Sequence, residues 1–384
     1  MRLTVVGNPD NRRVGLFTRA VLAAGLPRPA VLPWADVLTG AAPPPAGALV
    51  RVDSPGEDPE VDRLLRRAAT PARHGELVGL ADTYAGLVDG LGLVAAGGAE
   101  LLNHPADVAA LCDKRRCHAL LDAAGVPVPG ALPPVDGYAG LRAAMTEAGW
   151  SRVFVKPAHG SSAAGVIALA VGPGRVRAVT PIEVAPDGLF NSLRVRHYDD
   201  EATVAGLVDR LAPEGLHVER WLPKAGLGDR VVDLRVVVVA GRPTHAVVRA
   251  SRGPMTNLHL GNARGDLAEL RSAAGPAAWA AAMETCERAA ACFPRSLHVG
   301  VDLMFLLGWR RHAVAEVNAF GDLLPGVLVD GRDTYAEQVH ALTSGRWDSW
   351  REAAGRATPA TAPEAARPAA PGRPAGREVI ACGA

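Results

Sequence analysis

The feature that most constrains the fold is a pair of apolar segments, LHVGVDLMFLL and HAVAEVNAF, separated by a turn at Gly308–Arg310. Short apolar runs on both sides of a tight turn predict an antiparallel hairpin. In a hairpin centred on Trp309, Asp302 lies directly across from Glu316. Asn318 is two residues further along and therefore shares the same face.

Two carboxylates and an amide oxygen on one face of an apolar sheet predict a metal site. Hard oxygen ligands of this kind suit Mg²⁺, which takes one or two carboxylates and completes its shell with water and phosphate oxygens. Without a cation, two facing acids repel each other and cost stability. The alternative is a solvated face on which the acids occur by chance.

A second candidate site is the segment VFVKPAHGSSAAGV, in which a strand ends at Lys156 and a loop of small residues follows. Small side chains allow backbone N–H groups to approach phosphate oxygens, and the lysine adds a positive charge. A Gly/Ser hairpin loop without such a function is the alternative.

The chain of 384 residues is long enough for two or three domains. Residues 1–108 alternate strand and helix patterns, which predicts a small parallel α/β domain. Residues 109–345 form the second unit, which is rich in strands, and residues 352–384 are predicted to be a disordered tail because Pro, Ala and Gly dominate there. The expected strands are Leu3–Val6, Ala30–Leu32, Ala48–Val52 and the segments RVFVK, GVIALAV, LHVER, VDLRVVVV and THAVVRAS, and the expected helices are Val14–Ala24, Pro59–Ala69 and Ala277–Cys292.

Composition excludes several functions. The net charge of +1 and the 4% aromatic content argue against nucleic acid as a partner. The five cysteines form no CxxC pair, which argues against a disulfide framework or a zinc knuckle. No apolar run reaches the ~20 residues of a membrane span, and the N-terminal apolar segment is too short for a signal peptide, so a cytoplasmic protein is expected.

Lysine is rare in this chain, and its positions are therefore informative. Only Lys114, Lys156 and Lys224 occur, against 38 arginines. A compact ammonium performs tasks that a planar guanidinium cannot.

Several segments together resemble the ATP-grasp superfamily, in particular its RimK-like amino-acid ligases and, more distantly, glutathione synthetase. They are DK…AGVPVP, VFVKPAHGSSAAGV, HVERWLP, DLRVVVVAGRP, VVRASRGPMTNLHLGN and GVDLMF…AEVNAF, in this order over residues 109–340. The resemblance implies a small α/β domain before a two-lobed α+β ATP-grasp module. It also implies that ATP is held between two sheets.

The resemblance assigns roles to individual positions. It implies nucleotide binding by Lys114 and Lys156 on the phosphates, by Ser161 and Ser162 in the covering loop, and by Glu219, Trp221 and Leu222 around adenine. It implies that Arg235 and Arg249, with Asn257 beside them, reach the terminal phosphate and an acyl phosphate. Asp302, Glu316 and Asn318 match the Mg²⁺ ligands, for which two ions are expected and Mn²⁺ could substitute.

Some positions depart from the pattern of the family. The sequence continues as NAFGDL after Asn318, where a Ser-Pro-Gly turn is usual in RimK-like ligases. The segment between the lobes is longer than usual, so Asp229 is only a provisional choice for the ribose-binding acid. Lys224 is expected to be a solvated surface lysine, and His259 is expected to be a hydrogen-bonded structural group.

The resemblance implies an ATP-dependent carboxylate–amine ligase that forms an amide through an acyl phosphate and releases ADP and phosphate. A small-molecule kinase and a non-catalytic nucleotide-binding partner protein are the alternatives. Small-molecule or peptide carboxylates and amines are the expected partners, with a homodimer left open. The loop after the third strand, with Arg51 and Asp53, is a candidate for holding a small substrate, and a plain surface turn is its alternative.

Overall fold

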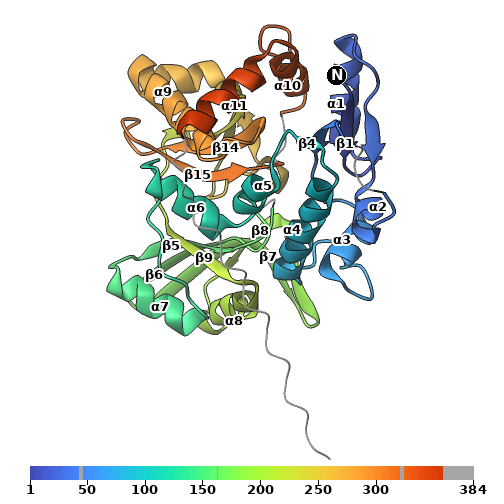
Figure 1. The fold of residues 1–384 in the computed structure, drawn as a ribbon. Helices are drawn as coiled ribbons and strands as arrows, with labels where there is room; N and C mark the ends of the chain where they lie inside the picture. Colours follow the sequence, from blue (N-terminus) through green and yellow to red (C-terminus); the bar gives the residue numbers. More distant parts are fainter. Residues whose placement is uncertain (43–45, 162, 321–323, 358–384) are drawn as a thin grey trace, which may run out of the picture.

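The N-terminal unit is a small parallel sheet covered by helices. The computed structural model describes residues 1–42, 46–161, 163–320 and 324–357. The parallel sheet has the strand order β2-β1-β3-β4 and is labelled in Figure 1. Its elements are β1 (Leu3–Val6), α1 (Arg12–Ala23), β2 (Ala30–Leu32), α2 (Trp34–Thr39), β3 (Leu49–Val52), α3 (Pro59–Arg66), α4 (Leu80–Ala96), β4 (Glu100–Leu101) and α5 (Pro105–Leu111).

The central lobe is an antiparallel sheet of strand order β8-β7-β6-β5-β9 with two helices packed against it. Buried aliphatic residues of β5, β6, β7 and β9 meet the apolar faces of α7 and α8. The lobe contains α6 (Lys114–Ala123), α7 (Tyr138–Glu147), β5 (Arg152–Pro157), β6 (Ile167–Gly172), β7 (Arg175–Ala185), β8 (Gly188–Tyr198), α8 (Glu201–Leu211), the 3-10 turn η1 (Ala212–Glu214) and β9 (Leu216–Arg220).

The C-terminal lobe is a second antiparallel sheet of order β13-β12-β11-β14-β15, with β10 paired to β11. Its strands β11 and β14 are almost entirely buried, because α9 covers one face of the sheet. The lobe contains β10 (Gly226–Leu227), β11 (Arg230–Val239), β12 (Arg242–Ser251), η2 (Leu258–Leu260), β13 (Ala263–Gly265), α9 (Leu267–Ala291), β14 (His298–Phe305) and β15 (His312–Asn318).

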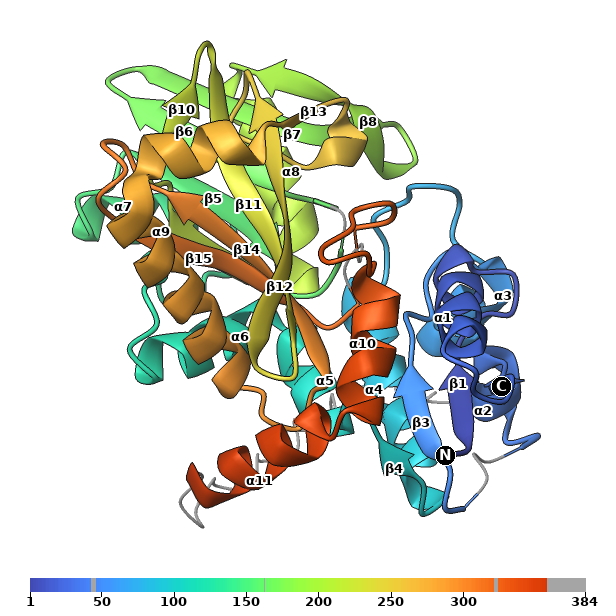
Figure 2. The same cartoon turned by 90° about the horizontal axis from the view of Figure 1, so that it is seen from above.

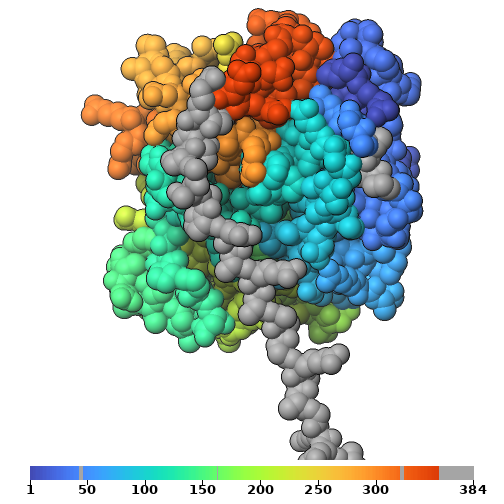
Figure 3. Space-filling view, viewed as in Figure 1, coloured from blue at the N-terminus to red at the C-terminus, as the bar shows by residue number. Residues whose placement is uncertain are grey.

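Two last helices join the C-terminal lobe to the N-terminal unit. In Figure 2, α10 (Thr334–Thr343) lies between the strands of the C-terminal lobe and the N-terminal sheet. It packs against α1, β11 and β12. The space-filling view in Figure 3 shows the same arrangement, with the C-terminal helices next to the blue N-terminal residues. The N-terminal unit therefore shares a core with the C-terminal lobe rather than standing apart.

The elements predicted in the N-terminal unit are confirmed, β1 and β2 with the predicted bounds and the others with ends that differ by at most three residues. Two strands of the central lobe, β7 and β8, were not predicted, and Pro181 interrupts the apolar pattern of β7. The predicted helix 277–292 is only the second part of α9, which is kinked at Gly275 and Pro276.

The predicted start of the tail at residue 352 is wrong, because the last helix, α11 (Arg346–Ala357), continues six residues past Arg351. Its first turns are tied to the body of the protein, since Trp347 is buried and Arg351 pairs with Glu100. Residues 358–384 lie outside the part of the chain that is described.

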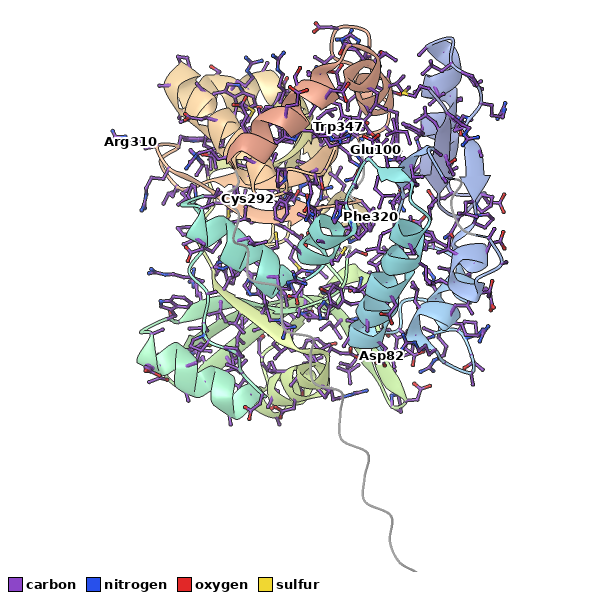
Figure 4. The ribbon with its side chains drawn as sticks, viewed as in Figure 1. Asp82, Glu100, Cys292, Arg310, Phe320 and Trp347 are labelled. Atoms are coloured by element: carbon purple, nitrogen blue, oxygen red, sulfur yellow. The ribbon has the colours of Figure 1, made fainter. Side chains whose placement is uncertain are left out.

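The predicted pairing of the two acids in the closing hairpin is confirmed, whereas the pairs nearer the turn are offset by one residue from a hairpin centred on Trp309. Asp302 of β14 is paired with Glu316 of β15, and Gly300 is paired with Asn318. Beyond this point the register shifts by one residue, which is a β-bulge at Ala315. The turn lies far from these acids, and Figure 4 shows Arg310 at its tip, projecting from the molecule.

Candidate active site

A cleft of about 770 Å³, partly open to solvent, lies between the two antiparallel sheets. Its walls come from β5, β9 and the loop between β5 and β6 in the central lobe, and from β11, β12, β14 and β15 of the C-terminal lobe. Of the predicted site residues, those that line it are Lys114, Lys156, Ser161, Glu219, Leu222, Arg249, Asn257, Asp302 and Glu316.

One face of the C-terminal sheet carries alternating charges. The strand registers place Arg249 opposite Asp233, and Arg235 opposite Asp302. Arg235 donates to both oxygens of Asp302, and Arg249 bonds Asp302 through Nη1 at 3.2 Å and Asp233 through Nε at 2.7 Å. The carboxylate of Asp302 therefore accepts from two guanidinium groups while it is 5% exposed.

This pairing decides the protonation state of Asp302. Burial alone would raise its pKa, but the adjacent Arg235 and Arg249 outweigh burial and hold the pKa below its usual range. Asp302 is thus an anion at neutral pH. A buried anion that already attracts two cations is suited to bind a metal ion or to orient arginines toward an anionic ligand.

Glu316, the cross-strand neighbour of Asp302, pairs with Lys114 in the cleft. Lys114 is the first residue of α6, and its Nζ lies 3.4 Å from Glu316 Oε1. The same ammonium donates to the carbonyl oxygen of Gly160 at 2.7 Å. Lys114 therefore connects the candidate metal ligand Glu316 to the loop of small residues at 159–165, called the Gly/Ser loop below.

Lys156 and Glu219 form an ion pair on neighbouring strands, β5 and β9. Glu219 also lies 3.4 Å from Nε2 of His217, and only 4% of it is exposed. Burial alone would raise the pKa of Glu219, but Lys156 and His217 lower it to about 2. Glu219 is therefore a fixed hydrogen-bond acceptor at the edge of the cleft.

Apolar side chains flank this acceptor. Phe154, Val166, Leu222 and Met304 all line the cleft. Trp221 is absent from the lining and packs against Phe154, with ring centroids 5.3 Å apart. Sequence reasoning missed Phe154. This residue lies two positions before Lys156 on β5, and residues two positions apart in a strand share a face.

The Gly/Ser loop returns to the sheet through a tight turn. Ser161 lines the cleft, whereas Ser162 lies outside the described residues. Gly165 has φ +71°, and a Cβ there would lie 2.5 Å from Cγ of Pro157. Only glycine meets both conditions, so this residue sets the path of the loop.

Lys224 is not a solvated surface lysine, and that expectation is wrong. Its side chain is only 12% exposed, and its Nζ donates to Asp233 at 2.8 Å and to Thr256 at 3.0 Å. All three residues line the cleft. An isolated lysine next to a proline has no sequence pattern that would reveal such a partner.

Asp229 and the pair Arg51 and Asp53 lie elsewhere. Asp229 is exposed and pairs with Arg252, away from the lining of the cleft, which argues against a ribose contact. Arg51 and Asp53 are 1% and 2% exposed, and they bond each other at 2.8 Å. Arg51 also donates to Gln338 of α10, so this pair joins the N-terminal unit to the C-terminal lobe, and the proposed substrate role is not supported. His259 lies in η2 and does not line the cleft.

The donor set at Asp302 fits a divalent cation that shares its shell with a ligand. Among the described residues, no three His, Cys, Asp or Glu side chains gather as a metal site made of protein alone. Asp302 and Glu316 supply two carboxylates, and Asn318 donates its amide N–H to Gly300 O at 3.3 Å, which leaves its amide oxygen for a cation. Mg²⁺ is commonly held by one or two carboxylates together with phosphate oxygens.

The chain has the ATP-grasp fold, as comparison with solved structures shows. The D-cycloserine synthetase DcsG matches at a TM-score of 0.55 with 16% identity, covering 88% of this chain and 98% of its own. The macrocyclase MdnC from Microcystis aeruginosa MRC, solved with the precursor peptide MdnA, matches at 0.53 with 12% identity and 90% and 100% coverage. The ATP-grasp ligase PsnB, solved with a minimal precursor, Mg and ADP, matches at 0.51 with 18% identity and 90% and 97% coverage. No protein-family profile and no curated protein sequence matches this chain.

Proposed function

We propose that this protein is an ATP-dependent carboxylate–amine ligase that forms an amide through an acyl phosphate. The observation that carries the proposal is the charge arrangement around Asp302. This anion lies opposite Glu316 and binds both Arg235 and Arg249, beside a cleft that is also lined by Lys114, Lys156 and Lys224. Such an arrangement suits the transfer of a phosphoryl group, because that reaction depends on positioning and on neutralising charge.

The nucleotide would lie along the cleft from the apolar end to the acids. Phe154, Val166, Leu222 and Met304 would enclose adenine, and Glu219 would accept a hydrogen bond from its amino group. Lys114, Lys156 and the backbone of the loop at Ser161 would bind the phosphates. The apolar end of the cleft thus matches adenine, and the charged end matches the phosphates of ATP.

Asp302, Glu316 and Asn318 would hold Mg²⁺, with two ions expected and Mn²⁺ as a substitute. When bound, the metal would neutralise charge on the terminal phosphates. Arg235 and Arg249 would stabilise the phosphoryl group during its transfer to the substrate carboxylate, and Asn257 would lie beside the acyl phosphate. An amine would then displace phosphate, so no protein nucleophile is needed.

Small-molecule or peptide carboxylates and amines are the proposed substrates. PsnB and MdnC were solved with precursor peptides, and DcsG is a D-cycloserine synthetase, so the same fold serves both kinds of substrate. Among the described residues no helix is long and apolar enough to cross a membrane.

The test is product analysis with a panel of carboxylates and amines, with hydroxylamine as a trapping nucleophile. We expect ADP, phosphate and a hydroxamate that appears only with the correct carboxylate. AMP and pyrophosphate would contradict phosphoryl transfer to a carboxylate. ADP with a phosphorylated alcohol would identify a kinase, and nucleotide binding without turnover across the panel would favour a non-catalytic role.

A further inference from the structure

Helix α4 of the N-terminal unit is bound to the central lobe at its first turn. The backbone N–H groups of Gly79 and Ala81 donate to the two oxygens of Glu214, at 2.8 and 2.9 Å. These N–H groups belong to the helix start, where they have no partner within the helix. A carboxylate from η1 therefore fixes the start of α4 against the lobe that carries the Gly/Ser loop.

One turn further along α4, Tyr84 stacks on His159, the residue that opens the Gly/Ser loop. The ring centroids are 3.9 Å apart, and the planes differ by 12°. Hydrogen bonds to other residues also hold both rings in place. The Tyr84 hydroxyl donates to Ala109 O at 3.1 Å and accepts from Arg116 at 3.3 Å, and His159 Nδ1 lies 3.3 Å from Cys112 O.

The stacked histidine is directly followed by the backbone that binds Lys114. Gly160 O accepts from Lys114 Nζ, which also lies 3.4 Å from Glu316. Leu80 of α4 approaches the same glycine, since a Cβ on Gly160 would lie 3.8 Å from Leu80 Cδ1. A continuous set of contacts thus runs from α4 through His159 and Gly160 to Lys114.

We propose that Tyr84 is a positioning residue that sets the phosphate-binding end of the cleft from the N-terminal unit. By holding His159, it fixes Gly160 O and keeps the Lys114 ammonium directed at the phosphates of a bound nucleotide. The inference rests on the proposed function, because it needs a nucleotide in the cleft. It predicts that the stack contributes to the binding of the phosphate tail and not to the binding of the base.

The test compares Mg²⁺-dependent affinities for ATP, ADP, AMP and adenosine by isothermal titration calorimetry on the full chain. Tyr84→Phe keeps the ring, Tyr84→Leu removes it, and Val88→Ala changes an exposed residue of the same helix as a matched control. We expect Tyr84→Leu to weaken ATP and ADP about 2- to 13-fold, the range that follows from the typical strength of an aromatic pair. The affinities for AMP and adenosine should not change, and Tyr84→Phe and Val88→Ala should bind like the wild type.

The outcomes separate the two proposals. A wild-type protein that binds no nucleotide overturns the proposed function and this inference with it. A wild-type protein that binds ATP while Tyr84→Leu binds it equally well overturns the inference alone, as does a loss that is equal for all four ligands. If Tyr84→Leu does not fold, His159→Leu removes the same stack from the other side and must give the same selective loss.

Discussion

At the scale of single residues, the cleft is organised by buried anions that are paired with cations, and two of these anions hold two cations each. Asp302 binds Arg235 and Arg249, Asp233 binds Arg249 and Lys224, and Glu219 binds Lys156. A buried carboxylate with one partner removed is left uncompensated, which is costly. Substitutions here therefore act on stability and on chemistry at once, and the predictions below are designed to separate the two.

Replacing Glu316 by Gln should abolish most Mg-ATP consumption while the protein remains folded. The change keeps the size of the side chain but removes the charge opposite Asp302, and losing one electrostatic contact to a transition state typically costs ~10²–10³ in rate. The measurement is ADP release at saturating Mg²⁺, with the exposed Glu284→Gln on α9 as the control. A rate for Glu316→Gln close to that of the wild type would contradict the assignment.

Replacing Lys224 by Met should destabilise the protein by about 1.5–3 kcal/mol, because the buried Asp233 loses one charged hydrogen-bond partner and keeps Arg249 as its cation. Neutralising that carboxylate as well, in Lys224→Met/Asp233→Asn, should restore part of the loss. The free energies of unfolding of the two single variants and the double variant form a thermodynamic cycle. Strictly additive losses would show that Lys224 and Asp233 do not interact in solution.

At the scale of elements, the loop between β5 and β6 depends on its last glycine. Gly165→Ala should cost about 2 kcal/mol or more, because an L-residue in the left-handed region is penalised by ~1–2 kcal/mol and its Cβ also overlaps Pro157. Gly172→Ala at the end of β6 is the matched control, since a Cβ there meets nothing within 4 Å. Thermal denaturation of both variants measures the difference, and equal melting temperatures would argue against this loop path.

At the scale of the whole molecule, a buried histidine makes the contact between the N-terminal unit and the C-terminal lobe sensitive to acid. Burial, and then the nearby Arg51, lower the pKa of His298 to about 3, from 6.5 in the unfolded chain. Below pH 6.5 the unfolded chain takes up a proton that the folded protein does not. The contribution of His298 is therefore complete above pH 6.5 and is lost toward pH 3, by up to ~1.4 kcal/mol per pH unit.

The variant His298→Gln should lower stability at pH 8 but show a shallower loss of stability between pH 6.5 and 4. The measurement is the free energy of unfolding of both proteins as a function of pH. Each value is compared with the value at pH 8, where His298 does not contribute to the pH dependence. Identical slopes in the two proteins would mean that His298 is not buried in a neutral state.

The sequence by itself determined the elements and the registers that follow from short-range periodicity. The positions of β1 and β2 and the facing of Asp302 and Glu316 could be predicted, because alternation along a strand and a short turn are decided by neighbours in the chain. Tertiary structure alone decided which partner each charged or aromatic group meets. Lys224 meets Thr256 across 32 positions, and Tyr84 stacks on His159 from another unit. Such contacts depend on how sheets and helices pack, and no local pattern encodes that.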